Sequence, residues 1–302
     1  MMSDQGAVRR RIVAALALLA VIAIMLGVAL AVGTGVTPDS PGLDPAALVL
    51  LFAIGIVAGI LGGLIGVGGS TILLPIMYFY LGFPEPVAVG TGLFVVIFTS
   101  LSGATGHFVR GNLDRRVAGR IAVGGLVGVL IGSWLFSFLV GYTNLLGLIL
   151  GLVFLVPSIS MIREGLRPPD RPEPECIGGT SPGHHLFGAG VGVLTGITGL
   201  GGGYALVPGL LYLFGAPVCV TTGTSLASMI PMAIVGGGIK LIEGYVAVGA
   251  GLVLAAGTIA GAQVGAATIQ RFRPATLKLI FGLYFLYAAV RFIAGFFGIW
   301  VP

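Results

Sequence analysis

The chain has 302 residues, of which 57% are hydrophobic and only 8% are charged. Soluble globular proteins carry about 25% charged residues, so this composition excludes an ordinary soluble enzyme, a disordered chain and a nucleic-acid-binding protein. The net charge of +5 arises from 15 basic and 10 acidic residues, whose placement matters more than their sum. Glycine contributes 53 residues without the period of collagen, which is typical of closely packed membrane helices.

Apolar segments long enough to span a bilayer recur along the chain, since a spanning helix needs about 20 residues. The first, 12–32, is longer than a signal-peptide core of about 7–15 residues, so we predict a retained helix. Two stretches, 46–82 and 186–216, are interrupted at their middles by glycine clusters. The remaining predicted spans are 88–108, 117–139, 144–162, 219–239, 246–268 and 276–299.

The basic residues predict the orientation of these spans. Lys240 and Arg291 fall on one predicted face, and the other Lys and Arg residues fall on the opposite face. Positive charge favours the cytoplasmic side. We therefore predict a multi-pass protein of the cell inner (plasma) membrane, with its N-terminus in the cytoplasm and its C-terminus outside. Each interrupted stretch must then return to its own side as a helical hairpin, with its glycine tip at intermediate depth.

The two halves align without a gap at an offset of 133 residues. The segment GILGGLIGVGGSTILLP (59–75) corresponds to GVLTGITGLGGGYALVP (192–208). Further on, small residues spaced four apart predict close helix packing in both halves. These are Gly124, Gly128 and Gly132, and their equivalents Gly257, Gly261 and Gly265.

The predicted fold is an all-α integral membrane protein, an inverted-topology repeat of helical bundles, each with a Gly-rich broken-helix hairpin. The halves are inverted because the charges orient them oppositely. The predicted domains are an N-terminal transmembrane helix with an outer loop (1–45), a first repeat (46–162), a cytoplasmic linker (163–185) and a second repeat (186–302). Such repeats with interrupted helices are typical of secondary transporters.

In these motifs the chain resembles the TauE/SafE sulfite exporter family of bacterial and archaeal membrane transporters. The resemblance rests on GVGGSTILLP (66–75) and GLGGGYALVP (199–208), with GTG (90–92) and GTS (223–225) downstream. It covers about residues 46–299. It implies transport of sulfite, sulfonates, sulfoacetate-like or related small organic anions, and it fixes neither the substrate nor the direction.

The two hairpin tips are the predicted substrate-binding site. The first N–H groups of a helix have no intrahelical partner and carry the positive end of its dipole, and glycine lets an anion approach them closely. Two tips meeting from opposite sides would cage a compact oxyanion; the alternative is that the glycines serve only helix packing. The candidates are Gly66, Gly68, Gly69, Ser70 and Thr71 in the first tip, and Gly199, Gly201, Gly202, Gly203 and Tyr204 in the second.

Several other polar residues are candidates with two interpretations. The hydroxyls of Thr91, Thr224 and Ser225 are either further substrate ligands or interhelix hydrogen bonds. His107 and Lys240, which are equivalent in the repeat, are either cationic attractors at the two mouths or side chains that reach the membrane interface. The same choice applies to Arg291, which lies within the last span.

We predict a secondary transporter of a small sulfur-containing anion that works by alternating access. The alternatives are an anion channel with a fixed pore and an intramembrane sensor or enzyme. No Walker, HExxH or GxSxG motif occurs, so we expect no enzyme, and we expect no cofactor and no metal site. No acidic residue falls inside a predicted span, because Glu85 lies at a hairpin base; proton coupling and a homodimer stay open. The expected partners are the anion and the lipid bilayer.

Overall fold

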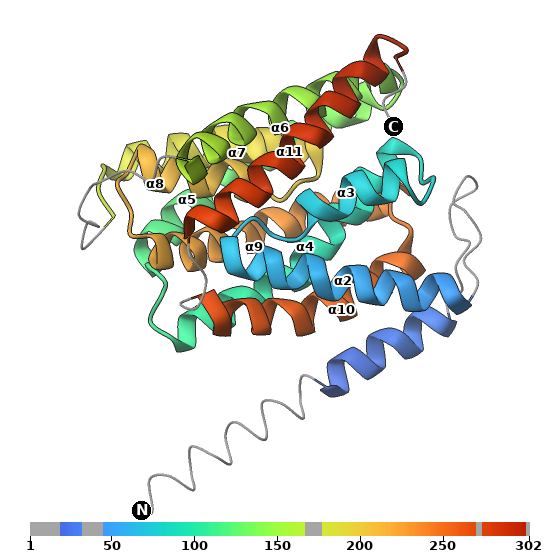
Figure 1. Ribbon diagram of the computed structural model, residues 1–302, viewed down its shortest axis with the longest axis horizontal. Helices are drawn as coiled ribbons and strands as arrows, with labels where there is room; N and C mark the ends of the chain where they lie inside the picture. Colours follow the sequence, from blue (N-terminus) through green and yellow to red (C-terminus); the bar gives the residue numbers. More distant parts are fainter. Residues whose placement is uncertain (1–18, 32–44, 167–176, 270–273, 300–302) are drawn as a thin grey trace, which may run out of the picture.

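The computed structural model describes residues 19–31, 45–166, 177–269 and 274–299, and within these ranges every regular element is a helix (Figure 1). Six of the described helices are long and apolar enough to cross a bilayer. Helices satisfy their own backbone hydrogen bonds, which a lipid environment requires. The prediction of an all-α membrane protein is confirmed.

The helices follow the predicted spans in chain order, and each glycine-interrupted stretch forms a long helix followed by one of ten residues. Of the predicted span 12–32, the helix Leu19–Ala31 is described, and the rest lies outside the described residues. The other helices are α2 (Pro45–Ile65), α3 (Ser70–Phe79), α4 (Glu85–Val109), α5 (Arg115–Leu139), α6 (Thr143–Leu166), α7 (Ser181–Thr198), α8 (Gly203–Tyr212), α9 (Val218–Ile242), α10 (Val248–Thr268) and α11 (Pro274–Phe296).

Both ends of the predicted linker 163–185 are helical in the structure. α6 continues to Leu166, and α7 begins at Ser181. Thr180 caps α7, because its hydroxyl accepts a hydrogen bond from Gly183 N. Pro182 is tolerated in this first turn, where an N–H group would have no helical partner. Proline and polar residues therefore mark the start of a helix here as well as a connection.

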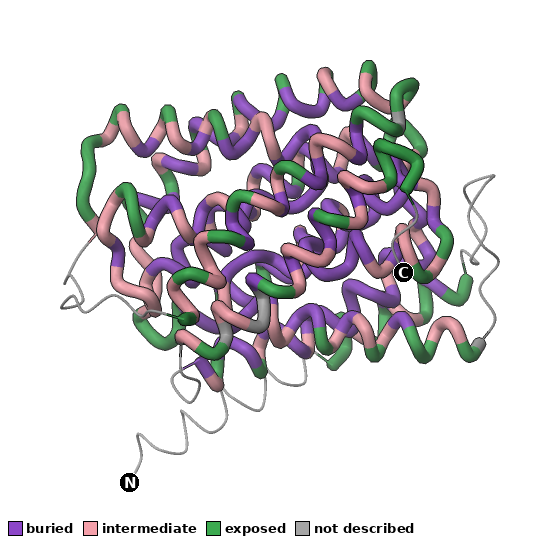
Figure 2. Tube along the Cα trace, turned by 45° about the horizontal axis from the view of Figure 1, so that its top comes forward, coloured by how far each residue is buried: buried purple, intermediate pink, exposed green. Residues whose placement is uncertain are grey.

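The offset of 133 residues also relates the helix contacts. α2 packs along α10, and α7, the equivalent of α2, packs along α5, the equivalent of α10. α4 packs against its own equivalent, α9, through the middle of the molecule, where Figure 2 shows mostly buried residues. α6 packs along its equivalent, α11. Each half thus contributes the first helix of its hairpin to the other half.

The predicted small-residue faces hold these exchanged pairs together. A Cβ atom at Gly128 on α5 would lie 2.8 Å from Val193 N on α7, too close for any side chain. At the equivalent Gly261 on α10 it would lie 2.7 Å from Ile60 N on α2. The backbones approach because glycine removes the Cβ that would separate them. These faces are buried within a single chain.

Candidate functional site

Each hairpin breaks at a tip whose backbone only glycine adopts readily. Gly66, Gly68 and Gly69 have φ angles of 82°, 76° and 50° between α2 and α3. Their equivalents between α7 and α8 have φ angles of 69°, 75° and 85°. A residue with a Cβ is strained at positive φ. The glycines of the motif are therefore needed to end one helix and start the next within four residues.

The two tips meet at the centre of the molecule. A Cβ added to Gly203 would lie 2.6 Å from the carbonyl carbon of Val67 in the other tip. The Ser70 hydroxyl donates a hydrogen bond of 2.9 Å to Gly199 O across this contact. Around the tips stand Val96 and Met229, an equivalent pair from α4 and α9, each of which is in reach of both tips.

His107 and Lys240 cap the broken helices. His107 Nε2 and Gly63 O lie 2.8 Å apart in the last turn of α2, and Lys240 Nζ donates a 2.7 Å hydrogen bond to Gly196 O in the last turn of α7. Carbonyl groups in a last turn have no helical partner, and a basic side chain satisfies them and opposes the dipole. The ammonium of Lys240 also lies 3.6 Å from the Phe136 ring centroid. Neither side chain is solvent-exposed, so neither stands at an open mouth.

The remaining candidate hydroxyls hold helices to one another. Thr91 Oγ1 accepts a hydrogen bond of 2.9 Å from Ala247 N, and the equivalent Thr224 Oγ1 accepts one of 3.0 Å from Asp114 N. Ser225 donates to Gly66 O at 2.8 Å. Each of these bonds joins one half to the other. The interpretation as interhelix hydrogen bonds fits these contacts.

Two candidate hydroxyls behave differently. Thr71 and its equivalent Tyr204 occupy the second positions of α3 and α8, and both side chains are buried. Among the described residues, the Thr71 hydroxyl has no hydrogen-bond partner, and the Tyr204 hydroxyl has only the Thr198 side chain near it, outside good hydrogen-bond geometry. A buried polar group without a partner costs about 1–3 kcal/mol. Such groups therefore mark a place where a ligand or water would be favoured.

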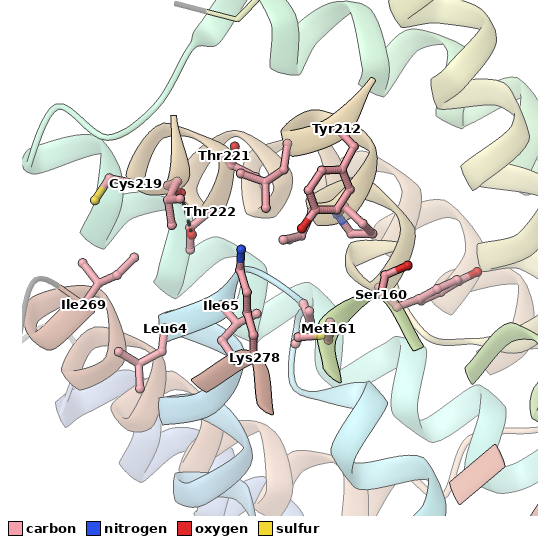
Figure 3. Close-up of a pocket in the computed structure, with 16 residues that line it drawn as sticks. Leu64, Ile65, Ser160, Met161, Tyr212, Cys219, Thr221, Thr222, Ile269 and Lys278 are labelled. Carbon is pink, nitrogen blue, oxygen red and sulfur yellow. Dashed lines mark hydrogen bonds between the residues drawn. The ribbon is translucent and has the colours of Figure 1, made fainter. Parts of the chain in front are cut away.

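A cavity of about 320 Å³ leads toward the tips from one end of the molecule (Figure 3). Val67 and Tyr204, both buried, belong to its lining together with half-exposed Tyr212. In Figure 3 the Lys278 side chain extends among the lining residues, and its ammonium forms a 2.7 Å ion pair with Glu164. A second cavity, of about 450 Å³, lies between α6, α7 and α8 and shares Tyr204 and Tyr212 with the first.

The sequence reasoning missed several lining residues of the first cavity. Thr221 and Thr222 begin the second turn of α9, just before the GTS motif, and Thr221 Oγ1 is buried without a partner among the described residues. In the sequence, two adjacent hydroxyl residues directly before the GTS motif could have indicated these lining residues. Lys278 was counted only as a charge that sets orientation. Cys219 also lines this cavity.

The opposite end of the molecule is closed around α3. Arg291 on α11 donates a 3.0 Å hydrogen bond to the Tyr287 hydroxyl and lies 4.3 Å from the Phe79 ring centroid. The hydroxyls of Tyr287 and Tyr80 are 2.6 Å apart. Arg291 thus ties α11 to the end of α3 and belongs to the lining of neither cavity described above.

Aromatic packing reinforces this closure. The rings of Tyr78 and Phe292 stack with centroids 5.6 Å apart, and Phe292 also stacks with Phe154 of α6 at 6.1 Å. Tyr284 donates a 2.9 Å hydrogen bond to Ile72 O, in the first turn of α3. We call Tyr78, Phe79, Tyr80, Tyr287 and Arg291, with these neighbours, the α3 clasp.

Comparison with known proteins places the chain among membrane transporters. The family described as sulfite exporter TauE/SafE matches residues 51–292. The probable membrane transporter protein YdhB of Bacillus subtilis is 31% identical over 222 residues, which are 72% of this chain and 88% of that protein. YunE, a probable membrane transporter protein of the same organism, is 27% identical over 253 residues, 77% of this chain and 92% of its own. A probable membrane transporter protein of Methanocaldococcus jannaschii is 28% identical over 253 residues.

Proposed function

The chain belongs to the sulfite exporter TauE/SafE family of membrane transporters, and we propose that it carries a small sulfur-containing anion, such as sulfite or a sulfonate, by alternating access. The observation that carries this proposal is the cavity that ends at the buried hydroxyls of Tyr204 and Thr221 beside a hairpin tip, of which that of Thr221 has no hydrogen-bond partner among the described residues. Tyr204 and Thr221 offer O–H donors there. Among the described residues, no backbone hydrogen bond takes up the N–H groups of Gly203 and Tyr204.

This donor set suits an anion whose charge is spread over several oxygens. N–H and O–H groups aimed at one point bind an oxyanion without a buried countercharge, and the N-terminus of α8 adds its dipole. Lys278 near the mouth supplies a positive charge on the way in, and in the structure it pairs with Glu164. The tips would then bind the head group.

The two ends of the molecule favour alternating access over a fixed pore. One end is open to a cavity beside α8, and the other is closed by the α3 clasp. The equivalence of the halves supplies the second state: α3 and α8 would exchange these environments. We further propose that the halves are inverted in the plasma membrane, with the cavity open to the cytoplasm, since Lys278 lines the cavity and Arg163 lies in the last turn of α6, which also lines it.

Uptake into liposomes tests the proposal. Labelled sulfite, a two-carbon sulfonate and a two-carbon carboxylate would be compared in wild type, Tyr204→Phe and Thr221→Val. We expect saturable uptake of a sulfur anion and a KM raised by about ten- to a hundredfold by either change, since a lost hydrogen bond to a charged group costs about 1.5–3 kcal/mol.

Tyr142→Phe, at an exposed tyrosine that lines neither cavity, is the matched control and should leave KM unchanged. Saturable uptake that is unaffected by both inner substitutions would place the substrate elsewhere. Uptake that never saturates would favour the channel.

A further inference from the structure

A buried carboxylate lies where the closed half of the molecule is packed. Glu85 is the first residue of α4 and is only 5% exposed. Its Oε1 is buried without a hydrogen-bond partner among the described residues. Sequence reasoning placed Glu85 at a hairpin base outside the predicted spans and did not predict its burial. The packing of α3, α4 and α6 over it makes the difference.

Among the described residues, no ion pair joins Glu85 to a basic side chain. On α6, Gly147 faces Glu85. A Cβ added to Gly147 would lie 3.5 Å from Oε1 and 3.6 Å from Oε2 of Glu85. α3 contributes Tyr78, which interacts electrostatically with both Glu85 and Arg291. On α11, Arg291 is engaged by Phe79 and Tyr287. An ionised carboxylate buried without a partner is very unfavourable, so the neutral form is favoured in this packing.

The repeat shows what would surround Glu85 in the other state. Its equivalent, 133 residues later, is Val218, which lines the open cavity beside α8. If α3 takes the place that α8 takes here, Glu85 comes to line the opposite cavity. Water then reaches the carboxylate and stabilises its charge.

We propose that Glu85 is a proton-binding site that governs opening of the α3 half: the carboxylate binds one proton as this half closes and loses it to water as it opens. The inference rests on the proposed alternating access. The conformation seen here binds the proton more tightly, so low pH favours it. High pH favours the conformation with the α3 half open and the α8 cavity closed. The second half carries valine at this position and has no such dependence.

Labelling of Cys219 reports the state of the α8 cavity without any substrate. In a Cys176→Ser background, the rate of maleimide reaction would be measured from pH 5.5 to 8 and divided by the rate of the unfolded chain at each pH, which removes the ionisation of the thiol. We expect this ratio to fall as pH rises, by at most about tenfold per pH unit, the limit for one proton. Glu85→Gln should keep the ratio high at every pH.

Controls separate this outcome from misfolding and from failure of the proposed function. Glu243→Gln removes a carboxylate that accepts a hydrogen bond from Ser137 and should titrate like the parent. Glu85→Val, which copies the second half, should match Glu85→Gln, and both should melt cooperatively. A parent ratio independent of pH, a Glu85→Gln ratio that still falls, or failure of both variants to fold would overturn the proposal. If no tested anion is taken up but the labelling behaves as expected, the proposed transport function is contradicted and the proposal for Glu85 stands.

Discussion

The two short helices of the hairpins, α3 and α8, start from the same motif and are held in different ways. α3 is fixed at both ends, by Tyr284 on Ile72 O and by Arg291 and Tyr287 around Phe79 and Tyr80. α8 has cavities on two sides, and Tyr204 and Tyr212 line both. The repeat supplies two equivalent hairpins, but the residues around them differ. Arg291, for example, is equivalent to Ser158 in the first half. Such differences decide which of the two short helices is held in place.

The two halves also use serines from different positions to bind the equivalent tip carbonyl groups. The carbonyls of Gly66 and Gly199, at equivalent places in the tips, each accept a serine hydroxyl. Ser225 on α9 serves the first, and Ser70 on α3 serves the second. At the place equivalent to Ser225 stands Gly92, where a Cβ would collide with Ser70 Oγ. Each tip thus has one serine hydroxyl on its carbonyl. Glycine at position 92 leaves the space that the Ser70 hydroxyl occupies.

The largest expected effect breaks what the halves share. Gly128→Leu and Gly261→Leu each place a side chain against backbone that cannot move aside. We expect both to destabilise the protein equally, by about 3 kcal/mol or more, at the upper end for overpacking. Thermal unfolding in detergent measures this. Gly119→Leu, on α5 with open space around it, should unfold like wild type, and an effect in only one half would contradict the equivalence of the two interfaces.

A smaller effect tests the equivalence of the two caps. Lys240→Met removes the donor to Gly196 O and should cost about 2 kcal/mol, typical of a charged hydrogen bond. Lys240→His should recover much of this loss, since His107 reaches Gly63 O in the same way. Thermal unfolding and uptake would be measured together. A raised KM with unchanged stability would instead support Lys240 as an attractor for the anion.

The smallest effect sharpens the difference between α3 and α8. Tyr80→Phe removes one hydrogen bond of the α3 clasp, worth about 1 kcal/mol, so we expect the closed α3 half to lose about fivefold in relative population. Maleimide labelling of Cys219 should slow accordingly. Tyr142→Phe, at an exposed tyrosine outside the clasp, should not change it. Faster labelling of Tyr80→Phe would show that the clasp does not favour the open α8 cavity.

Sequence reasoning predicted the spans and hairpins because length, hydropathy and glycine spacing are local properties of the chain. It also predicted that the glycine faces pack closely, because a helix repeats small residues on one side. It did not predict that α2 pairs with α10, since partner choice depends on residues far apart in the chain. The burial of Glu85 was not predicted for the same reason: it comes from α3 and α6, which sequence distance from a span cannot show.

The exchanged pairing of α2 with α10 has a consequence for biosynthesis. The glycine face of α2 is complete early, whereas its partner is made close to the end of the chain. At about 5–20 residues per second, α2 waits on the order of ten seconds or more before α10 exists. Until then its small-residue groove faces lipid or the machinery that inserts the chain. Neither half can complete its packing alone, so two separately made halves would have to find each other in the membrane before either is finished.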